Sequence, residues 1–191
     1  VLGLETELSA IKEPVIGYLG TIQDRVDIDL LAEVAKAHPD KKLALCGPIW
    51  KDIEVEFKTK LSAYPNILTT GRVPYQKIPA YIIRFEVAVI PHKLNYFIKY
   101  TNPMKMYEYL ACGKPIVSTE GAGINMFADF IHVANEPVSF NRMITKALEN
   151  DSEELRQARK EAVQQHSWRA RTDLMLDKVF HTLAHRQANH R

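Results

Sequence analysis

The segment with the clearest chemistry reads KYTNPMKMYEYLACGKPIVST and holds a glutamate, Glu108, among aromatic and apolar neighbours. Lys105 precedes Glu108 by three positions, so the two side chains share one face if the segment is helical. A carboxylate that accepts hydrogen bonds from two adjacent ribose hydroxyls is a familiar way to hold a nucleoside. The spacing therefore predicts a helix that offers a cation to phosphate and a carboxylate to a ribose one turn away.

The expected start of this helix has the residues of an anion site. Pro103 fits the first helical position, where its missing N–H costs nothing, and Asn102 fits the cap. The free N–H groups of Met104 and Lys105 are then expected to point toward a ligand, because a helix N-terminus binds anions readily. Two plainer alternatives stay open: Glu108 as a surface carboxylate that favours helix, and Lys105 as a solvated lysine of the first turn.

The rest of the chain predicts an α/β scaffold for these residues. Short apolar runs rich in β-formers alternate with segments whose apolar residues recur at helical spacing. The expected strands are residues 14–20, 42–48, 66–73, 86–91, 114–119 and 129–134, with helices at 27–39, 52–65 and 76–85, after Asn102, and through the tail from Ser139. Near-continuous apolar strands imply a parallel sheet with both faces covered. The predicted fold is a doubly wound, Rossmann-like parallel sheet of about six strands with helices on both faces and a helical C-terminal tail.

In such a sheet, ligands bind beyond the carboxyl ends of the strands. Small, polar and basic residues gather at those ends: Gly20, Thr21, Gln23 and Arg25 after the first strand, Gly71, Arg72 and Val73 after the third, His92 and the loop to Asn102 after the fourth, and residues 118–121 after the fifth. Arg72 also has the plainer interpretation of an ion-pair partner, and His92 that of a structural histidine. Neither GxGxxG nor GxxxxGKS occurs, so the signatures of a dinucleotide dehydrogenase and a P-loop ATPase are lacking.

Composition excludes several classes of protein. The 191 residues are 46% hydrophobic and 25% charged, which allows a real core and argues against disorder. A net charge of +2 is too balanced for nucleic acid to be the main partner. The two cysteines have no metal-ligand spacing and suit a reducing compartment, and no apolar run has the length of a membrane helix.

One domain is expected, with a separate N-terminal segment. Residues 1–13 are interpreted as an unattached leader or interdomain linker, and residues 14–191 as the domain. The chain begins with Val1 instead of methionine, so we expect it to be a piece of a longer protein.

NPMKMYEYLACGKPIVST, preceded by NILTTGRVPYQKIPAYIIRFEVAVIPH, resembles the donor-binding half of a GT-B glycosyltransferase. It is most similar to the retaining family-4 type of bacterial polysaccharide assembly, over most of the chain up to about Trp168. The resemblance implies the Rossmann-like C-terminal domain, which binds a nucleoside-diphosphate sugar without a cofactor or metal. It also implies a last helix, starting at Trp168, that packs toward an N-terminal acceptor domain, which is expected to carry the catalytic residues and is missing here.

Site residues carry over from the resemblance by position. Glu108 matches the glutamate that holds the ribose, Met104 and Lys105 the helix start that faces the diphosphate, and Arg72 and Val73 the loop near the base. The full set of predicted nucleotide contacts is Glu108, Lys105, Met104, Asn102, Thr101, Arg72, Val73, Thr21 and Arg25. The chain departs from the family at two places: Tyr100 stands where an earlier glutamate is usual, and only Arg25 represents the usual Arg…Lys pair.

The leading interpretation is a glycosyltransferase donor domain that serves polysaccharide or glycolipid assembly and is inactive without its acceptor domain. A nucleotide-sugar epimerase of the same fold and a degenerate, non-catalytic nucleotide- or protein-binding module remain as alternatives. The expected location is the cytoplasm, with the inner face of the membrane as an option. Basic residues at 156–160 and 169–171 are either a solvated face or a peripheral membrane patch.

Overall fold

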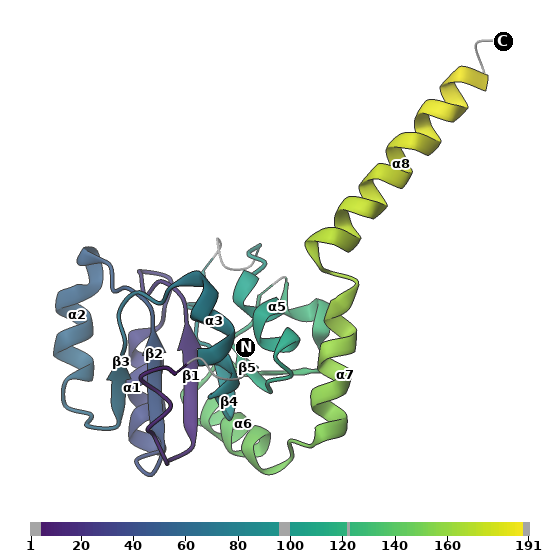
Figure 1. Ribbon diagram of the computed structural model, residues 1–191. Coiled ribbons are helices and arrows are strands. Elements are labelled where there is room, and N and C mark those ends of the chain that lie inside the picture. The colour runs from purple at the N-terminus through teal and green to yellow at the C-terminus, as the bar shows by residue number, and fades with distance from the viewer. Residues whose placement is uncertain (1–4, 96–99, 122, 189–191) are drawn as a thin grey trace.

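The computed structural model describes residues 5–95, 100–121 and 123–188. Its six strands form one sheet in the order β3-β2-β1-β4-β5-β6, and every pair is parallel. The strands are β1 (Val15–Leu19), β2 (Lys42–Cys46), β3 (Ile67–Thr69), β4 (Val87–Ile90), β5 (Ile116–Ser118) and β6 (Ile131–Val133). The predicted doubly wound parallel sheet is confirmed, and Figure 1 shows its arrowheads pointing upward, toward one edge.

Seven helices are described, together with two short 3₁₀ turns. The helices are α1 (Ile28–Ala37), α2 (Lys51–Leu61), α3 (Ile78–Ile83), α5 (Met104–Ala111), α6 (Pro137–Glu149), α7 (Glu153–Gln164) and α8 (Trp168–Ala188), and the turns are η1 (Tyr75–Lys77) and η2 (Ile124–Phe127). Local sequence explains the start of α1, because the Asp27 carboxylate accepts a hydrogen bond from the Leu30 N–H at 2.9 Å. The expected helical tail from Ser139 is present as α6, α7 and α8.

Alternate residues of each central strand supply two separate cores. Tyr18, Leu45 and Val89 pack with α1, α2 and α6 on one face of the sheet. Leu19 and Ile90 pack on the other face with α3, α5 and α7. Because side chains alternate across a strand, an apolar run buried on both sides needs helices on both faces, and the structure has them.

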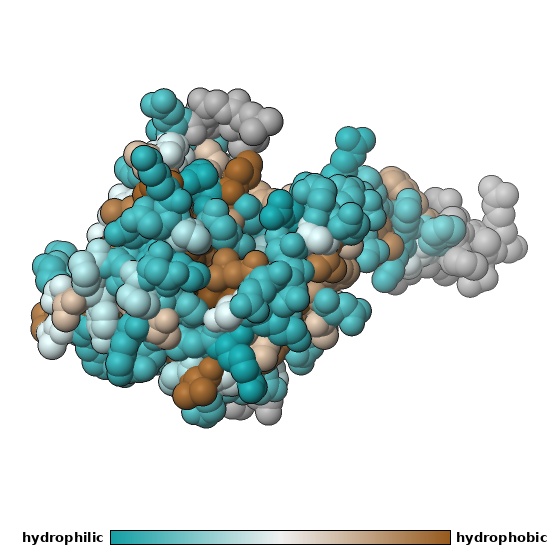
Figure 2. Space-filling model, turned by 90° about the horizontal axis from the view of Figure 1, so that it is seen from below, coloured by the Kyte–Doolittle hydropathy of each residue, from teal (hydrophilic) through white to brown (hydrophobic). Residues whose placement is uncertain are grey.

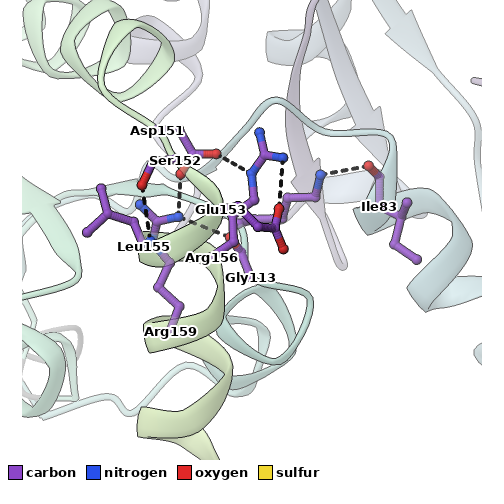
Figure 3. A network of polar contacts seen from close by, with 9 residues as sticks. Ile83, Gly113, Asp151, Ser152, Glu153, Leu155, Arg156 and Arg159 are labelled. Atoms are coloured by element: carbon purple, nitrogen blue, oxygen red, sulfur yellow. Dashed lines mark hydrogen bonds and ion pairs between the residues drawn. The ribbon is translucent and has the colours of Figure 1, made fainter.

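A buried ion pair fastens α7 to the C-terminal end of α5. Arg159 and Asp151 lie 2.6 Å apart with side chains only 6% and 8% exposed, and the same Arg159 nitrogen donates to the Gly113 carbonyl at 3.0 Å. Arg156 also reaches Asp151 from the surface at 2.7 Å. Figure 3 shows both arginines converging on Asp151 from α7. Gly113 has φ +71°, and a Cβ there would crowd the Arg156 backbone, so this junction requires glycine.

The last helix, α8, leaves the domain and projects away from the sheet (Figure 1). Its apolar side chains are largely exposed, including Met175 at 68% and Phe180 at 63%. Seen from below, the face of the domain away from the strand tips is mostly hydrophilic with small separate apolar patches (Figure 2). Within the described part of the chain, no helix is both long and apolar enough to cross a bilayer.

The segment before β1 differs from the unattached leader expected from sequence. Leu8 is fully buried in the core on the α5 side of the sheet. Arg84 donates to the Leu8 and Ile11 carbonyls, and the Tyr81 hydroxyl bonds to Glu7. An apolar side chain with a pocket to fill, together with these polar contacts, attaches residues 5–13 to α3.

Candidate functional site

Helix α5 begins one residue later than the sequence suggests. Met104 is its first residue, and Pro103 occupies the cap position with an extended ψ of 119°. Asn102 is therefore not the cap, since its amide nitrogen donates to the Tyr107 hydroxyl at 2.8 Å. The first N–H groups of the helix, those of Met104 and Lys105, still lack partners within the helix, as at any helix start.

The end of β1 is held against α5 and β2. The Tyr109 hydroxyl, fully buried on α5, accepts a hydrogen bond from the Leu19 N–H at 2.8 Å. One residue on, the Gly20 N–H donates to the Cys46 carbonyl at 2.8 Å. Gly47 has φ +155°, and a Cβ there would collide with the Gly20 backbone, so glycine permits this close approach. The turn after β1 is thus fixed beside the start of α5.

A cavity of about 350 Å³, which we call the strand-end cavity, lies between this turn and α5. Seven of the nine predicted contacts line it: Thr21, Arg25, Thr101, Asn102, Met104, Lys105 and Glu108. The other two, Arg72 and Val73, are absent from its lining; Arg72 is exposed, and Val73 packs partly buried against the core. The structure therefore gathers the end of β1, the segments that follow β1 and β4, and the first turns of α5 at the sheet edge where ligands were expected.

Lys105 lies deeper than a solvated lysine of a first turn. Its Nζ sits 3.8 Å from the centre of the Tyr18 ring and next to Gly20. Burial, assisted by the positive charge of Arg25, lowers the pKa of Lys105 to about 7, while Glu108 opposes the shift. The charge of this lysine is therefore poised near neutral pH, and an anion in the cavity favours its charged form.

Arg25 is the second cation of the cavity, and its neighbours hold it in place. With the Gln23 amide turned so that its oxygen faces the guanidinium, that oxygen accepts from Arg25 Nε at 2.8 Å and from a terminal nitrogen at 3.0 Å. The Arg25 carbonyl accepts from the Lys93 N–H at 2.8 Å, which ties the turn after β1 to the loop after β4. A guanidinium suits bidentate binding of phosphate oxygens.

Glu108 stands on the same face of α5 as Lys105, as its spacing predicts. It is partly buried, and burial raises the pKa of its carboxyl while Lys105 lowers it. Glu108 and Met104 also line a second cavity of about 530 Å³, which we call the aromatic cavity. The aromatic cavity lies between α5, η1 and the junction of α7 with α8, and Tyr75, Tyr107 and Trp168 supply its rings.

His92 lines the strand-end cavity, as its place after the fourth strand allowed, although it is not among the nine predicted nucleotide contacts. It is 4% exposed, and its Nε2 has no hydrogen-bond partner among the described residues. Burial, together with the charges of Lys105 and Arg25, lowers the pKa of His92 to about 3, so the imidazole is neutral. Its place directly after β4 was the available signal, but the burial that makes a lone histidine notable is visible only in the fold.

The arrangement can neutralise and orient a bound anion. Arg25, Lys105 and the start of α5 line the strand-end cavity, and the carboxylate of Glu108 lies about one turn along α5 from Lys105. Among the residues that the structure describes, no group of three or more His, Cys, Asp or Glu side chains is placed to hold a metal ion. The side chains that line the strand-end cavity offer hydrogen bonds and positive charge, which suit an anionic, hydroxyl-bearing molecule.

Comparison with known proteins assigns the class. Residues 25–177 match the family described as "Glycosyl transferase-like", and the chain belongs to that family. The putative teichuronic acid biosynthesis glycosyltransferase TuaH of Bacillus subtilis is 26% identical over 159 residues, which are 81% of this chain and 40% of that protein.

Solved structures confirm the GT-B glycosyltransferase fold inferred from the sequence. Sucrose-phosphate synthase of Thermosynechococcus elongatus aligns with a TM-score of 0.73 at 18% identity, over 90% of this chain and 46% of that one. Anabaena HepE in complex with UDP and glucose aligns with a TM-score of 0.67 at 13% identity, over 88% and 48% of the two chains. The chain thus spans less than half the length of these relatives.

Proposed function

We propose that this chain is the donor-binding domain of a glycosyltransferase that transfers a sugar from a nucleoside diphosphate to a hydroxyl acceptor. The observation that carries the proposal is the strand-end cavity. Arg25, Lys105 and the start of α5 line it, together with Glu108, which lies about one turn along α5 from Lys105. Phosphates suit the cations and the helix start, and a ribose diol suits the carboxylate. The family membership favours transfer over the epimerase alternative.

The role of these residues is to bind the donor and to stabilise its leaving group. When the sugar departs, negative charge develops on the diphosphate, and Arg25, Lys105 and the α5 N–H groups are fixed where they can balance it. Glu108 would fix the nucleoside, so that the sugar end is oriented before reaction. HepE was solved with UDP and glucose, which supports a nucleotide-sugar donor for this chain.

The acceptor belongs to the same proposal. TuaH, named as a putative glycosyltransferase of teichuronic acid biosynthesis, supports assembly of a polysaccharide or glycolipid. We propose the cytoplasm as the location, with the inner face of the membrane as an option, because a reducing compartment suits the two free cysteines, Cys46 and Cys112. An acceptor domain outside this chain would complete the enzyme.

Calorimetry with UDP, GDP, ADP, CDP and dTDP tests donor binding directly. We expect at least one of them to bind the 191-residue chain, and Arg25→Ala to weaken that binding. Arg142→Ala serves as the matched control, because Arg142 is an exposed arginine on α6 that lines neither cavity. Binding of none of the five would overturn the proposal and favour the degenerate module.

A further inference from the structure

The aromatic cavity has no role in the site as described so far, yet it adjoins the strand-end cavity. Met104 and Glu108 line both cavities, so α5 forms a shared wall between them. In a nucleoside diphosphate the ribose lies between the other two groups: the phosphates attach to one side of it and the base to the other. If Glu108 holds the ribose and the phosphates lie beside Lys105, the base extends away from the strand-end cavity.

We propose that the aromatic cavity receives the base of the nucleotide and that Trp168, the first residue of α8, stacks on that base. The inference rests on the proposed function and names a contact on an element that the predicted site does not include. It concerns the junction of α7 and α8, whereas the predicted base contacts are Arg72 and Val73. Neither of those two residues lines the aromatic cavity.

Exposure of the aromatic lining is the first support. Trp168 is 73% exposed and Tyr75 is 77% exposed, although both line this cavity. Large rings that the core does not use are available to a ligand. A base offers an aromatic face of matching size, and bases stack on aromatic side chains with little dependence on sequence.

The division of chemistry between the two cavities is the second support. Arg25 and Lys105 belong to the strand-end cavity, where the phosphates would lie. The rings of Tyr75, Tyr107 and Trp168 line only the aromatic cavity. Two cations, Lys160 and Arg171, line it as well, and Arg171 is engaged by the Tyr107 hydroxyl and ring. A ligand with an anionic end and an aromatic end, joined through a diol, matches this order along α5.

The position of the Trp168 ring is supported by its helix. One turn further along α8, Arg171 donates to the Tyr107 hydroxyl at 3.2 Å, and its guanidinium lies 5.3 Å from the centre of the Tyr107 ring. This contact attaches the first turn of α8 to α5. The wall that carries Trp168 is therefore held next to the wall that carries Glu108.

Fluorescence provides the sharpest test, because the chain has two tryptophans and the second, Trp50, lies before α2 outside both cavities. In a Trp50→Phe variant, Trp168 is the sole reporter. We expect UDP or GDP to quench its fluorescence, and inorganic pyrophosphate and ribose 5-phosphate, which lack a base, to leave it unchanged.

Calorimetry supplies the second arm. Trp168→Ala should weaken UDP or GDP binding on the order of tenfold and leave pyrophosphate binding unchanged, whereas Trp168→Phe should retain most of the affinity. Leu174→Ala is the control, an exposed residue of the same helix outside the cavity. Circular dichroism checks that each variant keeps its fold.

The outcomes separate the two proposals. If UDP or GDP binds the wild type but neither quenches Trp168 nor distinguishes Trp168→Ala from the wild type, the stacking inference is wrong and the donor-binding function stands. If neither of them binds the wild type while another nucleotide of the panel does, that nucleotide takes their place in both arms. If no nucleotide binds at all, both proposals fall together.

Discussion

The environment of Glu108 distinguishes a ligand-binding carboxylate from a surface residue that only favours helix. Its partly buried position on α5 raises the pKa of its carboxyl, and the charge of Lys105 one turn away opposes that shift. A surface glutamate that only favours helix would face water instead. Glu108 lines both cavities, and this position fits a carboxylate that accepts hydrogen bonds from the hydroxyl groups of a ligand.

We expect Glu108→Gln to weaken nucleoside-diphosphate binding by roughly tenfold to a hundredfold, because a hydrogen bond to a charged group contributes about 1.5–3 kcal/mol. Calorimetry measures the loss. A 2′,3′-dideoxy nucleotide should bind the wild type poorly but lose little more in the variant, since both changes remove the same contact. Normal affinity and an unchanged melting temperature for Glu108→Gln would show that the ribose role is wrong.

Lys105 predicts a pH dependence of binding. Its pKa is about 7 in the free protein, and a bound diphosphate should raise that pKa because opposite charges favour the ionised ammonium. Above pH 7 binding then takes up a proton, so the affinity should fall as the pH rises from 7.5 to 9. The limit is about tenfold for each pH unit. Among the residues that the structure describes, the charged and titratable groups facing Lys105 are Arg25, Glu108, His92 and Tyr18.

Lys105→Arg is the matched variant for this titration, because arginine stays charged throughout the range. Its diphosphate affinity should be flat from pH 7.5 to 9 if Lys105 is the group that titrates. A slope that persists in Lys105→Arg assigns the proton to another group and contradicts the prediction.

Single residues also show where sequence reasoning stops. Lys105 and Glu108 were placed on one face by spacing alone, which a regular helix guarantees. The prediction of Asn102 as the helix cap was wrong. The Asn102 side chain donates a hydrogen bond to the Tyr107 hydroxyl instead, and the position of Tyr107 depends on how the helix packs. His92 was expected at the ligand edge but not among the nucleotide contacts, since nothing local to a histidine reveals that it will be buried beside two cations.

At the scale of elements, the buried strands were predictable because apolar runs of this length have few alternatives between helices. The junction of α5 and α7 was not predictable, since it joins Asp151, just before α7, and Arg159 on α7 to Gly113, more than thirty residues earlier. The exposure of α8 to solvent was equally impossible to predict from the sequence. Its apolar residues would suit a buried helix, and only the fold shows them facing solvent.

We expect Asp151→Asn to destabilise the domain by about 3 kcal/mol, because removing one partner of a buried pair leaves the Arg159 charge without compensation. Urea denaturation measures the free energy of unfolding. Arg156→Ala is the control: this arginine reaches the same carboxylate from a side chain that is 48% exposed, so its loss should cost less than about 1 kcal/mol. Equal effects of the two variants would contradict a special role for the buried pair.

At the scale of the whole molecule, the projecting part of α8 should contribute little to the stability of the domain. Ending the chain after Leu176 removes outer turns whose Val179, Phe180 and Leu183 are each half or more exposed. We expect the free energy of unfolding in urea to change by no more than about 0.5 kcal/mol. A larger loss would mean that these turns pack against the domain in solution.

The same helix also gives the domain a lever arm. At 21 residues α8 is about 31 Å long, and its inner end carries Trp168 in the wall of the aromatic cavity. A partner that grips the outer turns and tilts the helix would move that wall, and the displacement at the grip would be larger than the one at the cavity. Thermodynamic linkage makes such coupling reciprocal. A nucleotide that fixes Trp168 would then also set the angle at which the domain presents α8 to its partner.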